Sequence, residues 1–88
     1  PHLESLLNIA SAYMLMGRLD ESRATLDYML QLAPRDPRVH HNLAMIYQLQ
    51  LDTPKALEGY ATVHELDPSF DQSYFNAGEL LRHQGRGH

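Results

Sequence analysis

Hydrophobic residues recur along the chain at helical spacing in five segments, and short polar stretches separate them. Because apolar side chains three and four positions apart share one face of a helix, this pattern predicts five amphipathic helices. We expect them over 3–16, from about 20 to 34, from 37 to about 50, from 54 to 68, and over about 71–84. Connections of two to five residues would make neighbouring helices antiparallel hairpins.

Glycine, proline and acidic residues mark the expected helix ends. Gly17 follows the last apolar position of the first segment, where a left-handed residue commonly ends a helix. Asp36-Pro37 and Thr53-Pro54 each read as an N-cap residue followed by a proline in the first helical position. Pro34 and Pro68 stop the second and fourth segments.

The chain repeats itself with a period of 34 residues. Aligning 3–36 with 37–70 gives six identities: Asn8/Asn42, Ala10/Ala44, Tyr13/Tyr47, Leu15/Leu49, Leu32/Leu66 and Pro34/Pro68. A second shift continues the series at Asn76. The sequence therefore predicts two complete units, 3–36 and 37–70, and the first helix of an incomplete third unit with a polar tail, 71–88.

Composition narrows the classes of protein. The 88 residues include no cysteine, which excludes disulfides and thiolate metal sites. A net charge of −4 argues against a nucleic-acid partner. No apolar run approaches about 18 residues, so we expect no membrane insertion and a soluble chain, with the cytoplasm favoured over other compartments. The chain begins at Pro1 rather than Met, and we interpret it as a piece of a longer solenoid.

The 34-residue, two-helix period resembles the tetratricopeptide repeat family, which implies an all-α, right-handed α-solenoid of antiparallel helix pairs. Three sets of residues carry the resemblance: Leu6, Ile9, Ala10, Tyr13, Ser22, Leu26, Met29 and Pro34; His40, Leu43, Ala44, Tyr47, Ala56, Tyr60, Val63 and Pro68; and Tyr74, Ala77, Gly78 and Leu81. Small residues at Ala10, Ala44 and Gly78 would let the two helices of a unit approach closely. The chain departs from the pattern where Ser22 replaces an alanine and Leu51 replaces the turn glycine.

The resemblance implies a concave groove lined by the first helix of each unit. It assigns to a partner-binding groove the following residues: Leu7, Asn8, Ser11, Arg38, His41, Asn42, Met45, Gln72, Phe75, Asn76, Glu79 and Arg82. Met14, Leu15 and Leu49 fall in the same register and make this surface partly apolar. The apolar members have an alternative role in ordinary packing against the adjacent helix.

Three asparagines, Asn8, Asn42 and Asn76, recur at one register. Asparagine is a mediocre residue inside a helix, so its recurrence needs a reason. Because an amide both donates and accepts hydrogen bonds, the series would suit the backbone of a bound peptide. The alternative is that these amides bond between helices or to water.

Some members of the family grip the C-terminal carboxylate of chaperone tails with a clamp of Lys, Arg and Asn. The matching positions here are Leu7, Ser11, Asn42, Gln72 and Asn76, of which only Asn42 fits that pattern. We therefore do not expect chaperone tails as ligands. An amphipathic helix or an apolar peptide segment suits this surface better.

No catalytic motif is present, and we expect neither an enzyme nor a cofactor. The six histidines show no His–x3–His pair, so we predict no metal site. His41 and His83 could both face the groove, where either could make partner binding depend on pH.

Two functions remain open at this point. The first is a non-catalytic protein-interaction module that binds a peptide or partner helix in the groove. The second is an architectural segment that self-assembles. Since no helix follows the fifth segment to cover it, we expect a self-association face at Tyr74, Ala77 and Leu81, and a homo-oligomer is one way to bury it.

Overall fold

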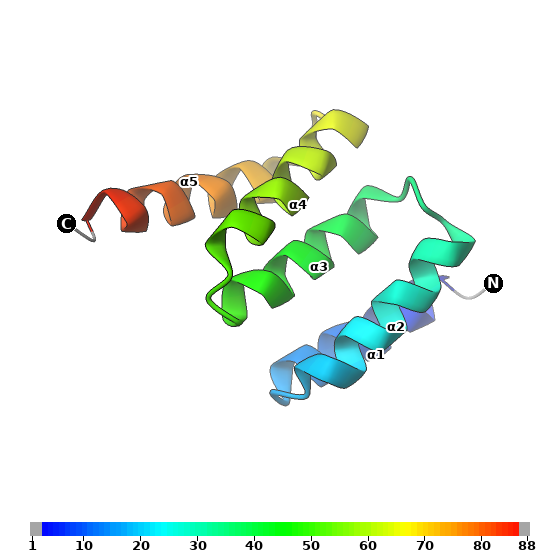
Figure 1. Cartoon of the computed structure of the whole chain (residues 1–88). Helices are drawn as coiled ribbons and strands as arrows, with labels where there is room; N and C mark the ends of the chain where they lie inside the picture. Colours follow the sequence, from blue (N-terminus) through cyan, green and yellow to red (C-terminus); the bar gives the residue numbers. More distant parts are fainter. Residues whose placement is uncertain (1–2, 87–88) are drawn as a thin grey trace.

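The computed structural model of the chain describes residues 3–86, and the side chains of these residues except 71–74 and 83–86. It contains five helices in this range: α1 (Leu3–Leu15), α2 (Leu19–Leu32), α3 (Pro37–Leu49), α4 (Thr53–Leu66) and α5 (Asp71–Arg86). α1 pairs with α2 and α3 pairs with α4 as antiparallel hairpins, and α5 lies against α4 (Figure 1). The predicted all-helical solenoid class is confirmed.

Several predicted helix ends differ from the observed ones by one or two residues, and two of these differences have a clear cause. The N-cap of α4 is Asp52 rather than Thr53, because the Asp52 carboxylate accepts a hydrogen bond from the backbone N–H of Lys55 at 3.4 Å. α5 continues to Arg86, two residues beyond the expected end at Gln84, so the glycine at 85 does not end the helix. The N-cap of α3 is Asp36, as predicted, and its carboxylate accepts from the backbone N–H of Arg38 at 3.0 Å.

The α1–α2 and α3–α4 turns have the same backbone geometry. The N–H of Arg18 donates to the carbonyl of Tyr13 at 2.8 Å, and 34 residues later the N–H of Asp52 donates to the carbonyl of Tyr47 at 2.9 Å. The residue before each donor has a positive φ, 79° at Gly17 and 62° at Leu51. Leu51 therefore occupies the left-handed conformation that the period reserves for glycine.

The core consists of two clusters that meet at α3. The first comprises Ala10, Leu26, Met29, Val39 and Ile46, which come from α1, α2 and α3. The second comprises Ala44, Ala56, Tyr60 and Leu80, which come from α3, α4 and α5. Each hairpin is thus closed by the first helix of the next unit, and α3 belongs to both clusters. The molecule is accordingly elongated, 44 × 28 × 16 Å.

Small residues set the distance between paired helices, but not all where the sequence suggests. A Cβ added at Gly59 of α4 would lie 2.7 Å from the Cβ of Ala44, so these helices approach as closely as glycine allows. Ser22 is buried, and its hydroxyl donates to the carbonyl of Ala10 at 2.6 Å, which explains how serine replaces alanine there. At Gly78 nothing lies within 4 Å of an added Cβ, so the predicted close approach at this position is wrong within the described chain.

Candidate protein-binding surface

The predicted groove residues lie on α1, α3 and α5, and they differ in how accessible they are. Asn8 is exposed and Asn42 is half-buried. Within the described part of the chain, no hydrogen bond engages the side-chain amide of either one. α1 and α3 are in contact; pairing with Asp36 mainly raises the pKa of Arg38, and the Glu4 carboxylate of α1 adds to the rise. These two amides are therefore accessible on neighbouring helices.

Asn76 has a different environment. Its amide nitrogen donates to the Tyr60 hydroxyl at 3.3 Å, and that hydroxyl donates to Oε1 of Gln48 at 2.6 Å. The three residues link α5, α4 and α3. Burial raises the pKa of Tyr60, and the hydrogen bond from Asn76 offsets part of that rise. The Asn76 amide thus makes a hydrogen bond between helices, which was the alternative to contact with a ligand.

His41 does not line an open surface, and its assignment to the groove is wrong. Its side chain is only 4% exposed. The ring centroid lies 5.6 Å from that of Tyr60 and 5.1 Å from that of Phe70, so the imidazole is packed where α3, α4 and the chain leading to α5 meet. Desolvation lowers the pKa of His41, because burial disfavours the charged imidazolium.

Both groove arginines are paired with acids. The Arg38 guanidinium lies 2.8 Å from the Asp36 carboxylate, which it also meets through Nε at 3.1 Å. This pairing holds the pKa of Asp36 below its usual range. Arg82 lies 3.3 Å from the Glu79 carboxylate. Since each guanidinium has an acidic partner, neither adds net positive charge to this surface.

The apolar groove residues divide into packed and exposed groups. Leu7 and Met14 pack against the first core cluster, and Met45 packs against the second. These three residues therefore have the alternative role in ordinary packing. Ser11 is half-buried, whereas Phe75 is 67% exposed. Gln72 lies outside the described side chains.

The predicted self-association face is not continuous. Ala77 packs against the second core cluster instead of facing away from it, so its assignment to that face is wrong. Leu81 is 56% exposed. Tyr74 lies outside the described side chains.

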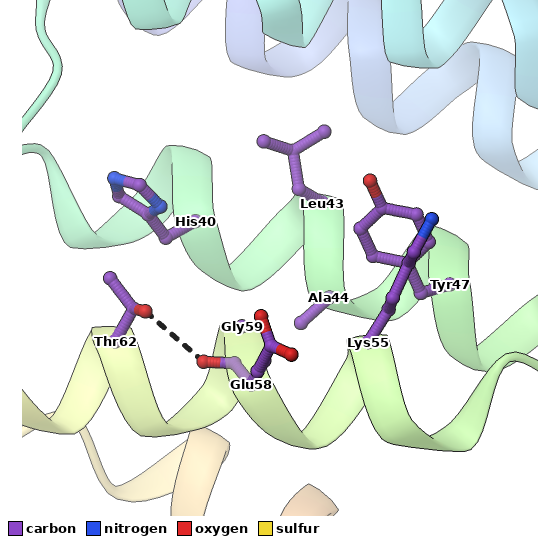
Figure 2. Close-up of a pocket in the computed structure, with 8 residues that line it drawn as sticks. All are labelled: His40, Leu43, Ala44, Tyr47, Lys55, Glu58, Gly59 and Thr62. Carbon is purple, nitrogen blue, oxygen red and sulfur yellow. Dashed lines mark hydrogen bonds between the residues drawn. The ribbon is translucent and has the colours of Figure 1, made fainter.

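The structure also has a hollow between α3 and α4 that the sequence did not indicate. It encloses about 290 Å³ and is lined by His40, Leu43, Ala44, Tyr47, Lys55, Glu58, Gly59 and Thr62 (Figure 2). At one end, the Nε2–H of His40 donates to the carbonyl of Pro34 at 2.8 Å, which fixes the ring. None of these residues belongs to the predicted groove, so the hollow is a separate surface.

A comparison with protein families identifies the repeat. Residues 3–36 match the family model described as tetratricopeptide repeat. The chain therefore contains a tetratricopeptide repeat over these residues. The five helices are consistent with about two and a half repeats of this kind. Tetratricopeptide repeats are generally non-catalytic protein–protein interaction modules.

Two curated relatives are similar to part of this chain. They are the human proteins named RANBP2-like and GRIP domain-containing protein 1 and protein 2. Each is 38% identical over 52 residues, which is 59% of this chain but only 3% of the relative. The chain therefore spans only a small part of the length of either relative.

Two further observations concern the described residues only. No group of three His, Asp or Glu side chains there is placed to hold a metal ion. None of the helices in that part of the chain is both long and apolar enough to cross a bilayer.

Proposed function

We propose that the α1–α3–α5 face binds an extended peptide or a helix of a partner protein. The observation that carries the proposal is the pair of amides at Asn8 and Asn42, which stand one repeat apart on neighbouring helices and make no hydrogen bond within the described part of the chain. Each amide offers a donor and an acceptor to a ligand backbone.

The spacing of the helices suits a peptide in extended conformation. Packed helices lie about 8–10 Å apart, and an extended chain advances about 3.3 Å per residue. Asn8 and Asn42 would then meet ligand residues about three apart. Phe75, which is 67% exposed on α5, would contact an apolar side chain further along the same ligand.

The charges of this face favour a neutral or apolar ligand. Arg38 and Arg82 are each engaged by a carboxylate, so a terminal carboxylate of a ligand would have to displace an existing acidic partner. This supports the expectation that chaperone C-terminal tails are not the ligands. The division into repeats 3–36, 37–70 and 71–88 is part of the same proposal, and the recurrence of the turn hydrogen bond after 34 residues supports it.

The experiment uses a peptide selected from a random display library against the 88-residue chain. Asn42→Ala should weaken binding of that peptide by about fivefold to tenfold, as expected for one or two hydrogen bonds, with helicity unchanged. Gln31→Ala, at an exposed amide on α2, is the control and should leave affinity unaltered. Equal affinity of the wild type, Asn42→Ala and Gln31→Ala for the peptide would refute the proposal.

The surface of α5 favours the architectural alternative. Leu81 exposes a large apolar side chain there, and no atom of the described residues lies within 4 Å of the missing Cβ of Gly78 on the same helix. If self-assembly is the function, Leu81→Asp should convert an oligomer into a monomer in sedimentation velocity at micromolar concentration. A wild-type chain that is already monomeric under these conditions would exclude it.

A further inference from the structure

Large apolar side chains gather, exposed, around the α1–α2 and α3–α4 turns. The exposed fractions are 89% for Leu15, 61% for Met16, 55% for Leu49 and 88% for Leu51. Two of them end helices α1 and α3, and two lie in the turns that follow. Clusters of exposed apolar residues on a small protein typically mark a binding surface.

The two turns are neighbours in space. A hollow of about 330 Å³ is lined from the first turn and the start of α2 by Gly17, Arg18, Leu19, Asp20 and Glu21, and from the end of α3 by Gln50. Leu15 and Met16 precede Gly17 in the sequence, and Leu49 and Leu51 flank Gln50. The α1–α2 and α3–α4 turns lie at the same end of their hairpins (Figure 1). We call Leu15, Met16, Leu49 and Leu51 the turn surface.

Leu51 is unusual in both its backbone conformation and its exposure. It has a φ of 62°, which glycine adopts without steric cost and leucine does not. Its side chain is 88% exposed, so packing within the chain does not compensate for the strain. The equivalent residue one repeat earlier is Gly17, which makes the same turn without an apolar side chain. A leucine here therefore makes physical sense if another molecule covers it.

The polar groups beside the turn surface indicate the charge of that molecule. Arg18 is paired with Glu21 at 3.4 Å. Asp20 is exposed, lines the hollow, and has no ion pair among the described residues. The chain as a whole carries a net charge of −4. A partner with a basic side chain beside its apolar residues complements this edge, whereas an acidic partner or an anionic lipid surface does not.

We propose that the turn surface docks the apolar face of a basic amphipathic helix from another protein. The apolar side chains of that helix cover Leu15, Met16, Leu49 and Leu51, and a Lys or Arg beside them enters the hollow toward Asp20. Leu15 and Leu49 lie where the proposed groove meets the turns, but Met16 and Leu51 lie outside it. Variants at these last two residues thus test the turn surface independently of the groove.

The test uses two synthetic helices with one leucine face, the rest of each being either lysine or glutamate. Binding to the ¹⁵N-labelled chain is followed by amide chemical shifts. The lysine helix should perturb residues of both turns, and the glutamate helix should bind at least about tenfold more weakly.

Two variants then separate docking from folding. Leu51→Gly removes an exposed side chain and relieves backbone strain, so it should bind the lysine helix about tenfold more weakly while melting at a higher temperature. Leu32→Ser, at a leucine that is 47% exposed at the other end of α2, is the matched control and should bind as the wild type does.

Four outcomes would overturn the proposal. Three of them are unchanged binding by Leu51→Gly, equal binding of the lysine and glutamate helices, and perturbed shifts confined to the α1–α3–α5 face. The fourth is a concentration-dependent shift of the turn residues without any peptide, which would assign the surface to a second copy of the chain. Asn42→Ala should leave binding of the lysine helix unchanged, so failure of the groove proposal is distinguishable from failure of this one.

Discussion

Single residues depart from the repeat pattern where their surroundings differ between units. Gly17 and Leu51 make equivalent turns with positive φ, although only one of them is glycine. His41 stands at the register of Leu7, yet it is buried against Tyr60 and Phe70. Equivalent positions in the sequence therefore differ in strain, burial and ionisation.

The strain at Leu51 predicts a stabilising substitution. Leu51→Gly should raise the free energy of unfolding by about 0.5–1 kcal/mol, because the left-handed conformation costs a residue with a Cβ about 1–2 kcal/mol and glycine loses part of that gain to backbone entropy. Urea denaturation measures the change. Gly17→Ala, at φ 79°, should destabilise the chain by a similar amount. A loss of stability in Leu51→Gly would show that the leucine is packed rather than strained.

The buried imidazole of His41 predicts a pH dependence of stability. Burial lowers its pKa in the folded chain from the ordinary value of 6.5. Between the lowered pKa of the folded chain and about pH 6.5, the unfolded chain therefore binds a proton at His41 that the folded chain does not bind, so stability should fall as the pH drops through this window. Above and below the window this contribution is constant.

Urea denaturation between about pH 5 and pH 8 measures this dependence. His41→Phe, which keeps an aromatic ring between Tyr60 and Phe70, should flatten the profile. His40→Gln serves as the control and should retain it. An unchanged slope in His41→Phe would assign the dependence to other histidines.

Helices in this chain are positioned by contacts that differ between hairpins. α1 and α2 are joined by the buried hydrogen bond from Ser22 to the carbonyl of Ala10. α3 and α4 are joined by the close approach at Ala44 and Gly59. α5 is held to the preceding hairpin by burial of Leu80 and by the hydrogen bond from Asn76 to Tyr60. The 34-residue repeat thus accommodates several kinds of contact between its helices.

The close approach of α3 and α4 predicts opposite effects of two glycine substitutions. Gly59→Ala should destabilise the chain by about 1–3 kcal/mol, because the new Cβ would lie 2.7 Å from that of Ala44 and the helices must separate. Gly78→Ala should stabilise it by about 1 kcal/mol, since its Cβ meets nothing within 4 Å and alanine favours the helix. Thermal denaturation followed by circular dichroism measures both. Equal effects of the two substitutions would argue against the close approach.

At the scale of the whole molecule, stability is built from neighbouring units. Both core clusters include residues of α3, namely Val39 and Ile46 in one and Ala44 in the other. The helices at the two ends of the chain each contribute to one cluster. In such an arrangement local opening begins at the ends and reaches the centre last.

Hydrogen exchange should show this order directly. We expect the slowest amide exchange in α3, faster exchange in α2 and α4, and the fastest in α1 and α5. Native-state exchange followed by mass spectrometry measures the order. Exchange in α5 as slow as that in α3 would show that the molecule opens as one cooperative unit.

The sequence alone determined the helices, their pairing and the turn positions. Apolar spacing and the 34-residue period are local properties, and they depend on backbone geometry that does not vary with the neighbours. The same local rules placed the N-cap of α4 at Thr53 instead of Asp52, because two acceptable capping residues adjoin there. They also ended α5 too early, because a glycine inside a helix is tolerated.

Only the tertiary structure decided which side chains of the candidate surface are accessible. The register placed Asn8, Asn42 and Asn76 together, but Tyr60 of a different helix engages Asn76 and leaves the other two amides open. In the same way, α4 and the segment before α5 bury His41. A repeat determines the face on which a residue lies, whereas burial and hydrogen bonding depend on what the next helix brings against that face.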